Sequence, residues 1–224
     1  SLGREGELLG GPVMKRIFLV RHGETDWNRE GRFQGQMDIP LNRTGLEQAR
    51  SVAEALKDVP LDRIVASPLS RAFETARTLA VRKGLSVDTE ADFREISHGL
   101  WEGRTADEVD KEWAEMLYLW HSHPEAVEMP GEESLADVHK RTWNAFQRLS
   151  ERVEGSIVLV SHDAVLKVLL CAILGCPFGS FWRFQVANGS ISLLEHNDNG
   201  WCILLLGEVS HLGDPFFRRE QKGL

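Results

Sequence analysis

The sequence predicts a single three-layer α/β domain, with a mostly parallel sheet flanked by helices. Short apolar runs at 17–20 and 157–160 end abruptly in polar residues, as buried parallel strands do. Between these runs, apolar residues recur at helical spacing. The 224 residues fall within the range of one such domain, and no linker, internal repeat or low-complexity tract divides them.

The expected sheet contains strands at 17–20, 63–66, around 86–89, and 157–160. Near the C-terminus, two alternating segments at 190–194 and 201–206 flank Asn197-Asp198-Asn199-Gly200. Asn-Gly between alternating segments is a strong hairpin signal, so these two segments are predicted to pair as antiparallel strands.

Five helices are expected around this sheet. The first runs from Thr44 to about Lys57, because Thr44 and Glu47 have the spacing of a capping box. The others cover about 68–83, 106–121, 134–153 and 164–174, where Pro68 is placed near a first turn and Gly175 ends the last helix. The segment at about 101–134 is predicted to be a small helical lid over the site.

The composition of the chain limits the classes of binding partner that can be expected. The net charge of −8, from 34 acidic and 26 basic residues, argues against a nucleic-acid partner, which would need a basic face. A small anion remains compatible, because the local charge of a cleft steers it. No apolar stretch approaches the ~20 residues that span a bilayer, so no membrane partner is expected.

Residues 1–13 are polar and glycine-rich without the apolar core of a signal peptide. We expect them to be an extension or a cloning remnant before a native start at Met14, with the domain at 14–212 and a tail at 213–224. Three cysteines in apolar surroundings are interpreted as buried, reduced thiols of a cytoplasmic protein: Cys171, Cys176 and Cys202. The apolar 164–174 helix is of a kind often found at subunit contacts or against a sheet, which leaves a homodimer open.

Two histidines follow two predicted strands directly. Arg21 and His22 come after the strand at 17–20, and His162 comes one residue after the strand at 157–160. Ligands bind at the carboxyl edge of open α/β sheets, so neighbouring strands would bring these side chains together there. Arg71, near the start of the 68–83 helix, would add a second guanidinium beside free backbone N–H groups. The sequence therefore predicts an anion site.

The chain resembles the histidine phosphatase superfamily, the phosphoglycerate-mutase-like group, from residue 15 to about 212. The residues that carry the resemblance form several short motifs: Arg21-His22-Gly23-Glu24-Thr25, Trp27-Asn28, Arg32-Phe33-Gln34-Gly35, Asp38-Ile39-Pro40-Leu41, Thr44-Gly45, Ser67-Pro68-Leu69-Ser70-Arg71-Ala72 with Thr75-Ala76, Glu95, Gly99 and Ser161-His162. The resemblance implies an enzyme that forms a phosphohistidine intermediate.

The chemistry of phosphoryl transfer assigns roles to these residues. A neutral imidazole can attack phosphorus if its other nitrogen donates to a fixed acceptor, and His22 is assigned as this nucleophile. Arg21 and Arg71 can each bind phosphate oxygens bidentately. His162 is expected to be protonated beside the bound dianion, and Glu95 to protonate the leaving oxygen and later activate water.

Further donors to the phosphate are expected from Asn28 and from the backbone of Gln34 and Gly35, and no metal or other cofactor is required. Ser67 and Ser161 are interpreted as hydrogen-bonding supports, because neither lies in a Gly-x-Ser-x-Gly motif. His98 and Trp101 are placed at the border of the pocket as contacts. His121-Ser122-His123 is interpreted as a solvated turn in preference to a metal site.

Three functions compete: a phosphatase for a small phosphorylated substrate, a cofactor-dependent phosphoglycerate mutase, and a non-catalytic phospho-ligand binding module. Mutases of the family carry paired arginines in the insertion, but residues 105–134 hold one lysine, Lys111, and nine acids: Asp107, Glu108, Asp110, Glu112, Glu115, Glu125, Glu128, Glu132 and Glu133. The segment at 129–134 also resembles the Pro-Gly-Gly-Glu-Ser stretch of the family's phosphatases. A phosphatase is therefore favoured, and the presence of His22 and Glu95 weakens the binding-module interpretation.

Overall fold

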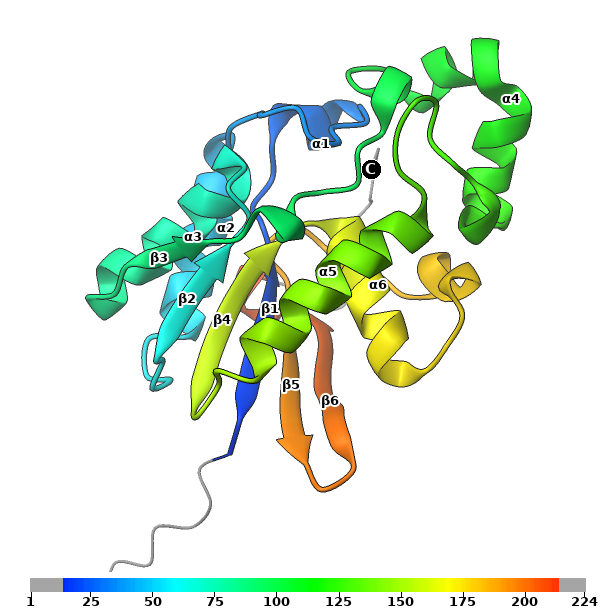
Figure 1. Ribbon diagram of the computed structural model, residues 1–224. Coiled ribbons are helices and arrows are strands. Elements are labelled where there is room, and N and C mark those ends of the chain that lie inside the picture. Colours follow the sequence, from blue (N-terminus) through cyan, green and yellow to red (C-terminus); the bar gives the residue numbers. More distant parts are fainter. Residues whose placement is uncertain (1–13, 214–224) are drawn as a thin grey trace, which may run out of the picture.

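A computed structural model describes residues 14–213 and gives a six-stranded sheet in the order β3-β2-β4-β1-β5-β6 (Figure 1). The N-terminal extension and all but the first residue of the predicted C-terminal tail lie outside the described part of the chain. The four strands β1 (Arg16–Arg21), β2 (Arg63–Ala66), β3 (Val87–Thr89) and β4 (Ser156–Ser161) are mutually parallel. The hairpin of β5 (Ile191–Asn197) and β6 (Gly200–Glu208) adds two antiparallel strands, as the Asn-Gly signal predicted.

The register of the parallel strands places their carboxyl ends at one edge. Phe18 pairs with Val158, and Arg21 pairs with Ser161 at the last position of both strands. Strand β2 lies on the other side of β4, and its last residue, Ala66, pairs with Val160. The segments that begin with His22, Ser67 and His162 therefore leave the sheet side by side, which confirms the prediction made for the two histidines.

Helices cover both faces of the sheet, with α2 (Arg43–Ala55) and α3 (Ser70–Lys83) on one face and α5 (Leu135–Ser150) and α6 (Asp163–Leu174) on the other (Figure 1). Alternate side chains of each strand enter opposite cores, because successive side chains of a strand point to opposite faces. Phe18 and Val20 pack in the core beside α2 and α3, whereas Ile17 and Leu19 pack beside α5 and α6. The three-layer fold is thus confirmed.

The remaining helices lie at the carboxyl end of the parallel strands or in connections. Helix α1 (Asp26–Glu30) follows β1, and α4 (Ala106–Ser122) stands above α5 and α6 (Figure 1). Trp113 has non-helical backbone angles, φ −134° and ψ 41°, so α4 is kinked in its middle. Short 3-10 turns complete the chain: η1 (Ala91–Phe93), η2 (Gly99–Trp101), η3 (Pro124–Ala126), η4 (Phe178–Arg183) and η5 (Ser210–Leu212).

Two helix starts differ from the prediction. Helix α2 is capped by Asn42, whose side chain accepts from the Gly45 N–H at 2.9 Å, so the expected Thr44 capping box is wrong. An asparagine side chain can reach the free N–H groups of the first turn as well as a threonine can. Helix α3 begins at Ser70, two residues after Pro68. Arg71 is still in its first turn, as expected.

One other expectation needs correction, and one of the two settings expected for the 164–174 helix is confirmed. Cys202 is exposed, because it lies on the edge strand β6, whereas Cys171 is buried and Cys176 is partly buried. Residues 163–171 of α6 are all buried within the domain, so packing against the sheet explains the apolar character of this helix. Across residues 14–213, no helix is both long enough and apolar enough to cross a membrane.

Candidate active site

The histidines predicted to converge do so. The ring centroids of His22 and His162 are 5.1 Å apart, and both side chains are buried. The backbone N–H of His22 donates to the carbonyl of Ser161 at 3.0 Å, which continues the β1–β4 pairing beyond the strands. The parallel register of two neighbouring strands therefore sets the distance between the imidazoles.

His22 is held in the state that a nucleophile needs. Its Nδ1 lies 2.6 Å from the carbonyl oxygen of Gly23, so Nδ1 carries the proton and donates, which leaves the lone pair on Nε2. Burial, together with the positive charges of Arg71 and Arg21, holds the pKa of His22 well below its usual range. The ring is therefore neutral at physiological pH.

Arg21 and Arg71 are both buried and held by fixed acceptors. The Nη1 of Arg21 donates to Asp163 at 3.1 Å and to the Val186 carbonyl at 2.7 Å. Arg71 donates to the carbonyl oxygens of Met37 and Gly35, each at 2.7 Å. The Nε of each arginine is buried without a hydrogen-bond partner in the described part of the chain, so both retain a donor for an anion.

His162 is fixed by Ser67. The Nε2 of His162 lies 2.7 Å from the Ser67 hydroxyl, which also accepts from the Leu69 N–H at 3.3 Å. Because the hydroxyl proton is free to be donated to Nε2, the remaining proton of a neutral ring belongs on Nδ1. Burial, then the charge of Arg71, holds the pKa of His162 well below its usual range. The expected imidazolium therefore needs the charge of a bound anion.

Glu95 reaches the same region from the segment after β3. Its Oε1 accepts from the Ile96 N–H at 2.8 Å, and its Oε2 accepts from the Ala164 N–H at 3.4 Å, at the start of α6. Burial, then the negative charge of Asp163, raises the pKa of Glu95. The carboxyl group is thus predisposed to hold a proton, which suits an acid.

The three other predicted phosphate ligands, Asn28, Gln34 and Gly35, have contacts with other residues of the site. The side-chain oxygen Oδ1 of Asn28 accepts from the Thr25 N–H at 3.1 Å, and the side-chain oxygen Oε1 of Gln34 accepts from the Thr25 hydroxyl at 2.6 Å. Gly35 has a φ of +52°, and a Cβ there would collide with Glu102. Its carbonyl accepts a hydrogen bond from Arg71, so the structure connects Gly35 to one of the two arginines that are predicted to bind phosphate.

Several supporting residues were not singled out from the sequence. Asn188 donates from Nδ2 to the His22 carbonyl at 3.1 Å and to Asn28 at 3.2 Å. Thr75 accepts from the Gly23 N–H at 3.1 Å and donates to the Arg71 carbonyl at 2.8 Å. Asn188 lies in a loop without a motif. Thr75 belonged to a recognised motif and could have been found.

Ser67 and Ser161 support the site as predicted. Ser67 contacts His162, and the Ser161 hydroxyl donates to the Phe93 carbonyl at 2.7 Å. This second bond ties the end of β4 to the segment that carries Glu95. The two serines thus hold neighbouring parts of the site through their hydroxyl groups.

His98 and Trp101 lie inside an aromatic cluster. The ring of His98 lies 5.0 Å from Phe33 and 5.8 Å from Trp120 of α4, measured between centroids, and Trp101 stacks against it. His98 and Trp101 are both fully buried, and neither ring nitrogen of His98 forms a hydrogen bond within residues 14–213. Burial, with a smaller effect from Arg71, lowers the pKa of His98 to about 3. The cluster joins α4 to the segment after Glu95.

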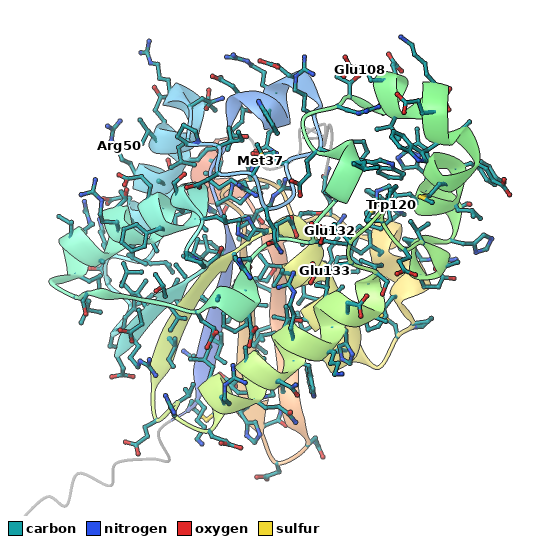
Figure 2. The ribbon with its side chains drawn as sticks, turned by 45° about the horizontal axis from the view of Figure 1, so that its top comes forward. Met37, Arg50, Glu108, Trp120, Glu132 and Glu133 are labelled. Atoms are coloured by element: carbon teal, nitrogen blue, oxygen red, sulfur yellow. The ribbon has the colours of Figure 1, made fainter. Side chains whose placement is uncertain are left out.

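Arginines that lie outside the acidic segment 105–134 neutralise part of its negative charge. Glu108 pairs with Arg32 at 3.3 Å, Glu112 with Arg104 at 2.7 Å, and Glu133 with Arg141 at 2.7 Å. Glu132 and Glu133 precede α5, and Figure 2 labels both of them together with Met37 and the buried Trp120. Across residues 14–213, no three side chains of His, Cys, Asp or Glu gather in a way that could hold a metal ion.

Known proteins are similar to this one over most of its length. The histidine phosphatase superfamily (branch 1) matches residues 17–209. Phosphoserine phosphatase 1 of Hydrogenobacter thermophilus is 37% identical over 90% of this chain and 96% of its own length. A probable phosphoglycerate mutase, GpmB, of an Enterobacter species is 36% identical over 90% of this chain and 97% of its own.

Solved structures agree in fold. YhfR of Bacillus stearothermophilus superposes with a TM-score of 0.84 at 31% identity, covering 88% of this chain and 98% of that one. A mycobacterial glucosyl-3-phosphoglycerate phosphatase superposes with a TM-score of 0.77 at 29% identity, covering 86% of this chain and 98% of that one. These matches confirm the predicted family and an enzyme of the phosphatase type: the chain belongs to branch 1 of the histidine phosphatase superfamily.

Proposed function

We propose that the protein hydrolyses small phosphorylated metabolites through a phosphohistidine on His22, without a metal ion. The observation that carries this proposal is the pairing of a neutral, carbonyl-anchored His22 with two buried arginines that keep unpaired donors. Positive charge from the protein itself would stabilise the transferring phosphoryl group, which is the task that a metal performs in other enzymes.

In the first step, the lone pair on Nε2 of His22 attacks phosphorus, and the bond from phosphorus to the leaving oxygen breaks. Glu95 gives its proton to that oxygen. In the second step, water attacks the phosphohistidine and transfers a proton to Glu95 as the P–N bond breaks. Arg21, Arg71 and the Nδ1 of His162 hold the phosphoryl oxygens, with Asn28, Gln34 and Gly35 as further ligands, and α4 with its flanking segments at about 101–134 forms the lid.

A mutase activity is the second candidate, because the relative GpmB is named as a probable phosphoglycerate mutase. A mutase must hold a bisphosphate, and the excess of acids in 105–134 disfavours its second phosphate. Arg32, Arg104 and Arg141 neutralise only part of this segment. Phosphoserine and glucosyl-3-phosphoglycerate, named for two relatives, are proposed as the first substrates to test.

The test is a panel of phosphomonoesters assayed with excess chelator. Wild-type protein should release phosphate, and His22→Ala should lose on the order of 10³-fold or more, as removal of a nucleophile does. Labelled substrate followed by an alkaline quench should leave acid-labile label on the wild-type protein and none on His22→Ala. His139→Ala is the control, because this partly buried histidine of α5 packs on Trp143 and Phe178 and is not among the predicted site residues. Activity lost on chelation, or label found on serine, would overturn the proposal.

A cytoplasmic location is also proposed, and three free thiols at Cys171, Cys176 and Cys202 support a reducing compartment. The expected partner is a small phosphorylated substrate, with no nucleic acid and no membrane. The homodimer left open by the sequence stays a prediction. Light scattering on the purified protein would test it.

A further inference from the structure

A buried chain of charges continues from Arg21 into helix α6. Asp163, the residue after His162, accepts from Arg21 through one oxygen at 3.1 Å and pairs with Lys167 through the other at 3.2 Å. All three side chains are almost completely excluded from solvent, at 3% exposure or less. A buried carboxylate between two cations is thus attached directly to an arginine of the site.

Lys167 occupies an aromatic enclosure. Its Nζ lies 4.6 Å from the centre of the Phe181 ring and 4.7 Å from that of Trp182, both in η4. These rings stabilise a cation through their π faces and replace part of the water lost on burial. Burial still lowers the pKa of Lys167, while the charge of Asp163 opposes this effect. Burying a lysine costs free energy, and the ion pair with the buried Asp163 carboxylate offsets part of this cost.

The same turn of α6 reaches the predicted acid. The Ala164 N–H donates to Glu95, and Asp163 precedes it in the chain, so the two carboxyl groups approach the helix start together. After burial, the negative charge of Asp163 contributes most to raising the pKa of Glu95. Arg21 and Arg71 oppose this effect, Lys167 also acts on Glu95, and Arg141 donates to the Glu95 carbonyl.

We propose that Asp163 is a positioning residue for phosphoryl transfer and that Lys167 is its counter-ion: the pair orients Arg21 and sets the charge beside Glu95. This inference rests on the proposed function. With Nη1 fixed by Asp163 and by the Val186 carbonyl, the remaining edge of the Arg21 guanidinium is directed to the phosphoryl oxygens. Lys167 balances the charge of Asp163, so that Glu95 can both give and take a proton.

The two members of the pair act on Glu95 with opposite sign. Removing the negative charge in Asp163→Asn lowers the pKa of Glu95, because its anion loses a repelling neighbour. Removing the positive charge in Lys167→Met raises it, because Asp163 is then less compensated. If Asp163 and Lys167 only supported packing, the two substitutions would shift the pKa of Glu95 in the same direction or not at all.

The experiment measures kcat/KM for an alkyl phosphate against pH, with chelator present. The basic limb of this profile is the pH range in which kcat/KM falls as the pH rises. It should lie lower by about half a pH unit or more in Asp163→Asn, and higher by about as much in Lys167→Met. The ionisation of the substrate is common to all variants and cancels in the comparison. Titration calorimetry with inorganic phosphate should show on the order of tenfold weaker binding in Asp163→Asn, which a loss of Arg21 orientation predicts.

Lys167→Arg, which keeps the charge, should restore the wild-type limb. Asp62→Asn is the control, since Asp62 is an exposed carboxylate far from Arg21 that accepts a hydrogen bond from the Ser156 N–H at 2.8 Å, at the other end of β4. If Asp163→Asn does not fold, the comparison of Lys167→Met with Lys167→Arg decides the matter. Limbs that coincide, or move in the same direction, would overturn the inference, whereas an inactive wild type would overturn the proposed function.

Discussion

Gly23 and Gly45 touch through their backbones: a Cβ placed on Gly23 would lie 2.8 Å from the Cα of Gly45. Gly23 also supplies the carbonyl that fixes the tautomer of His22. Gly45 lies in the first turn of α2 and is hydrogen-bonded to its capping residue. The loop that carries the nucleophile is therefore set directly on a helix start, with no side chain between them.

Gly23→Ala should reduce both activity and stability. The added methyl group meets backbone atoms that cannot rotate away, so overpacking of about 1–3 kcal/mol is expected. The His22 loop must move, and a shift of about 1 Å in a reacting group costs on the order of 10²-fold in rate. Thermal unfolding and kcat/KM for one phosphomonoester measure the two effects.

Gly84→Ala is the control for this substitution. Gly84 ends α3 with a φ of +65° and has open space around it, so the variant should lose stability but retain its activity. Gly23→Ala at wild-type rate would mean that the loop tolerates displacement.

Glu95→Gln should slow phosphorylation of the enzyme by an alkyl phosphate far more than by p-nitrophenyl phosphate. An alkoxide needs a proton in the transition state, whereas a nitrophenolate barely does. Because Glu95 also acts on water in the second step, single-turnover phosphoryl transfer must be measured. Equal losses for the two esters would leave Glu95 a positioning role only.

The pH profile gives a second prediction for Glu95. The pKa of this group is raised, so the protonated acid persists above the usual range and is lost as the pH rises through the raised value. The rate of phosphorylation by an alkyl phosphate should fall there in the wild type. Glu95→Gln should lack this limb, and a limb that survives in the variant would assign it to another group.

Isomerisation of 3-phosphoglycerate should be slower than hydrolysis of the best phosphomonoester, even with 2,3-bisphosphoglycerate added. The uncompensated acids of 105–134 repel a second phosphate. Coupled assays for both activities on one preparation decide the matter. Mutase turnover above hydrolysis of every ester tested would reassign the protein.

His98→Leu should flatten the dependence of stability on pH. His98 titrates at about 3 in the folded protein but near 6.5 when unfolded, so between these values the unfolded chain binds one more proton. The contribution of His98 to the free energy of unfolding therefore falls as the pH falls, by up to ~1.4 kcal/mol per pH unit. Denaturant unfolding at pH 7.5, 6 and 5 should show the variant gaining relative to wild type. Parallel curves would contradict the buried, neutral ring.

The main elements of the fold and the site could be predicted from local patterns. The strands at 17–20, 63–66 and 157–160 lie within or match β1, β2 and β4, because apolar runs of that length are buried wherever they occur in such a domain. His22 and His162 could be paired because a parallel register brings strand ends together. Helix starts were less certain, since Asn42 and Thr44 are both acceptable caps.

What the sequence alone determined was therefore the order of elements and the family, and it supplied the prediction of which residues meet the phosphoryl group. Tertiary structure decided the partners of those residues: Asn188 with His22, Ser67 with His162, and Asp163 with both Arg21 and Lys167. It also placed His98 in an aromatic cluster. These contacts depend on burial and on side-chain directions across different elements, and the free energy of a buried charge is set by every neighbour at once.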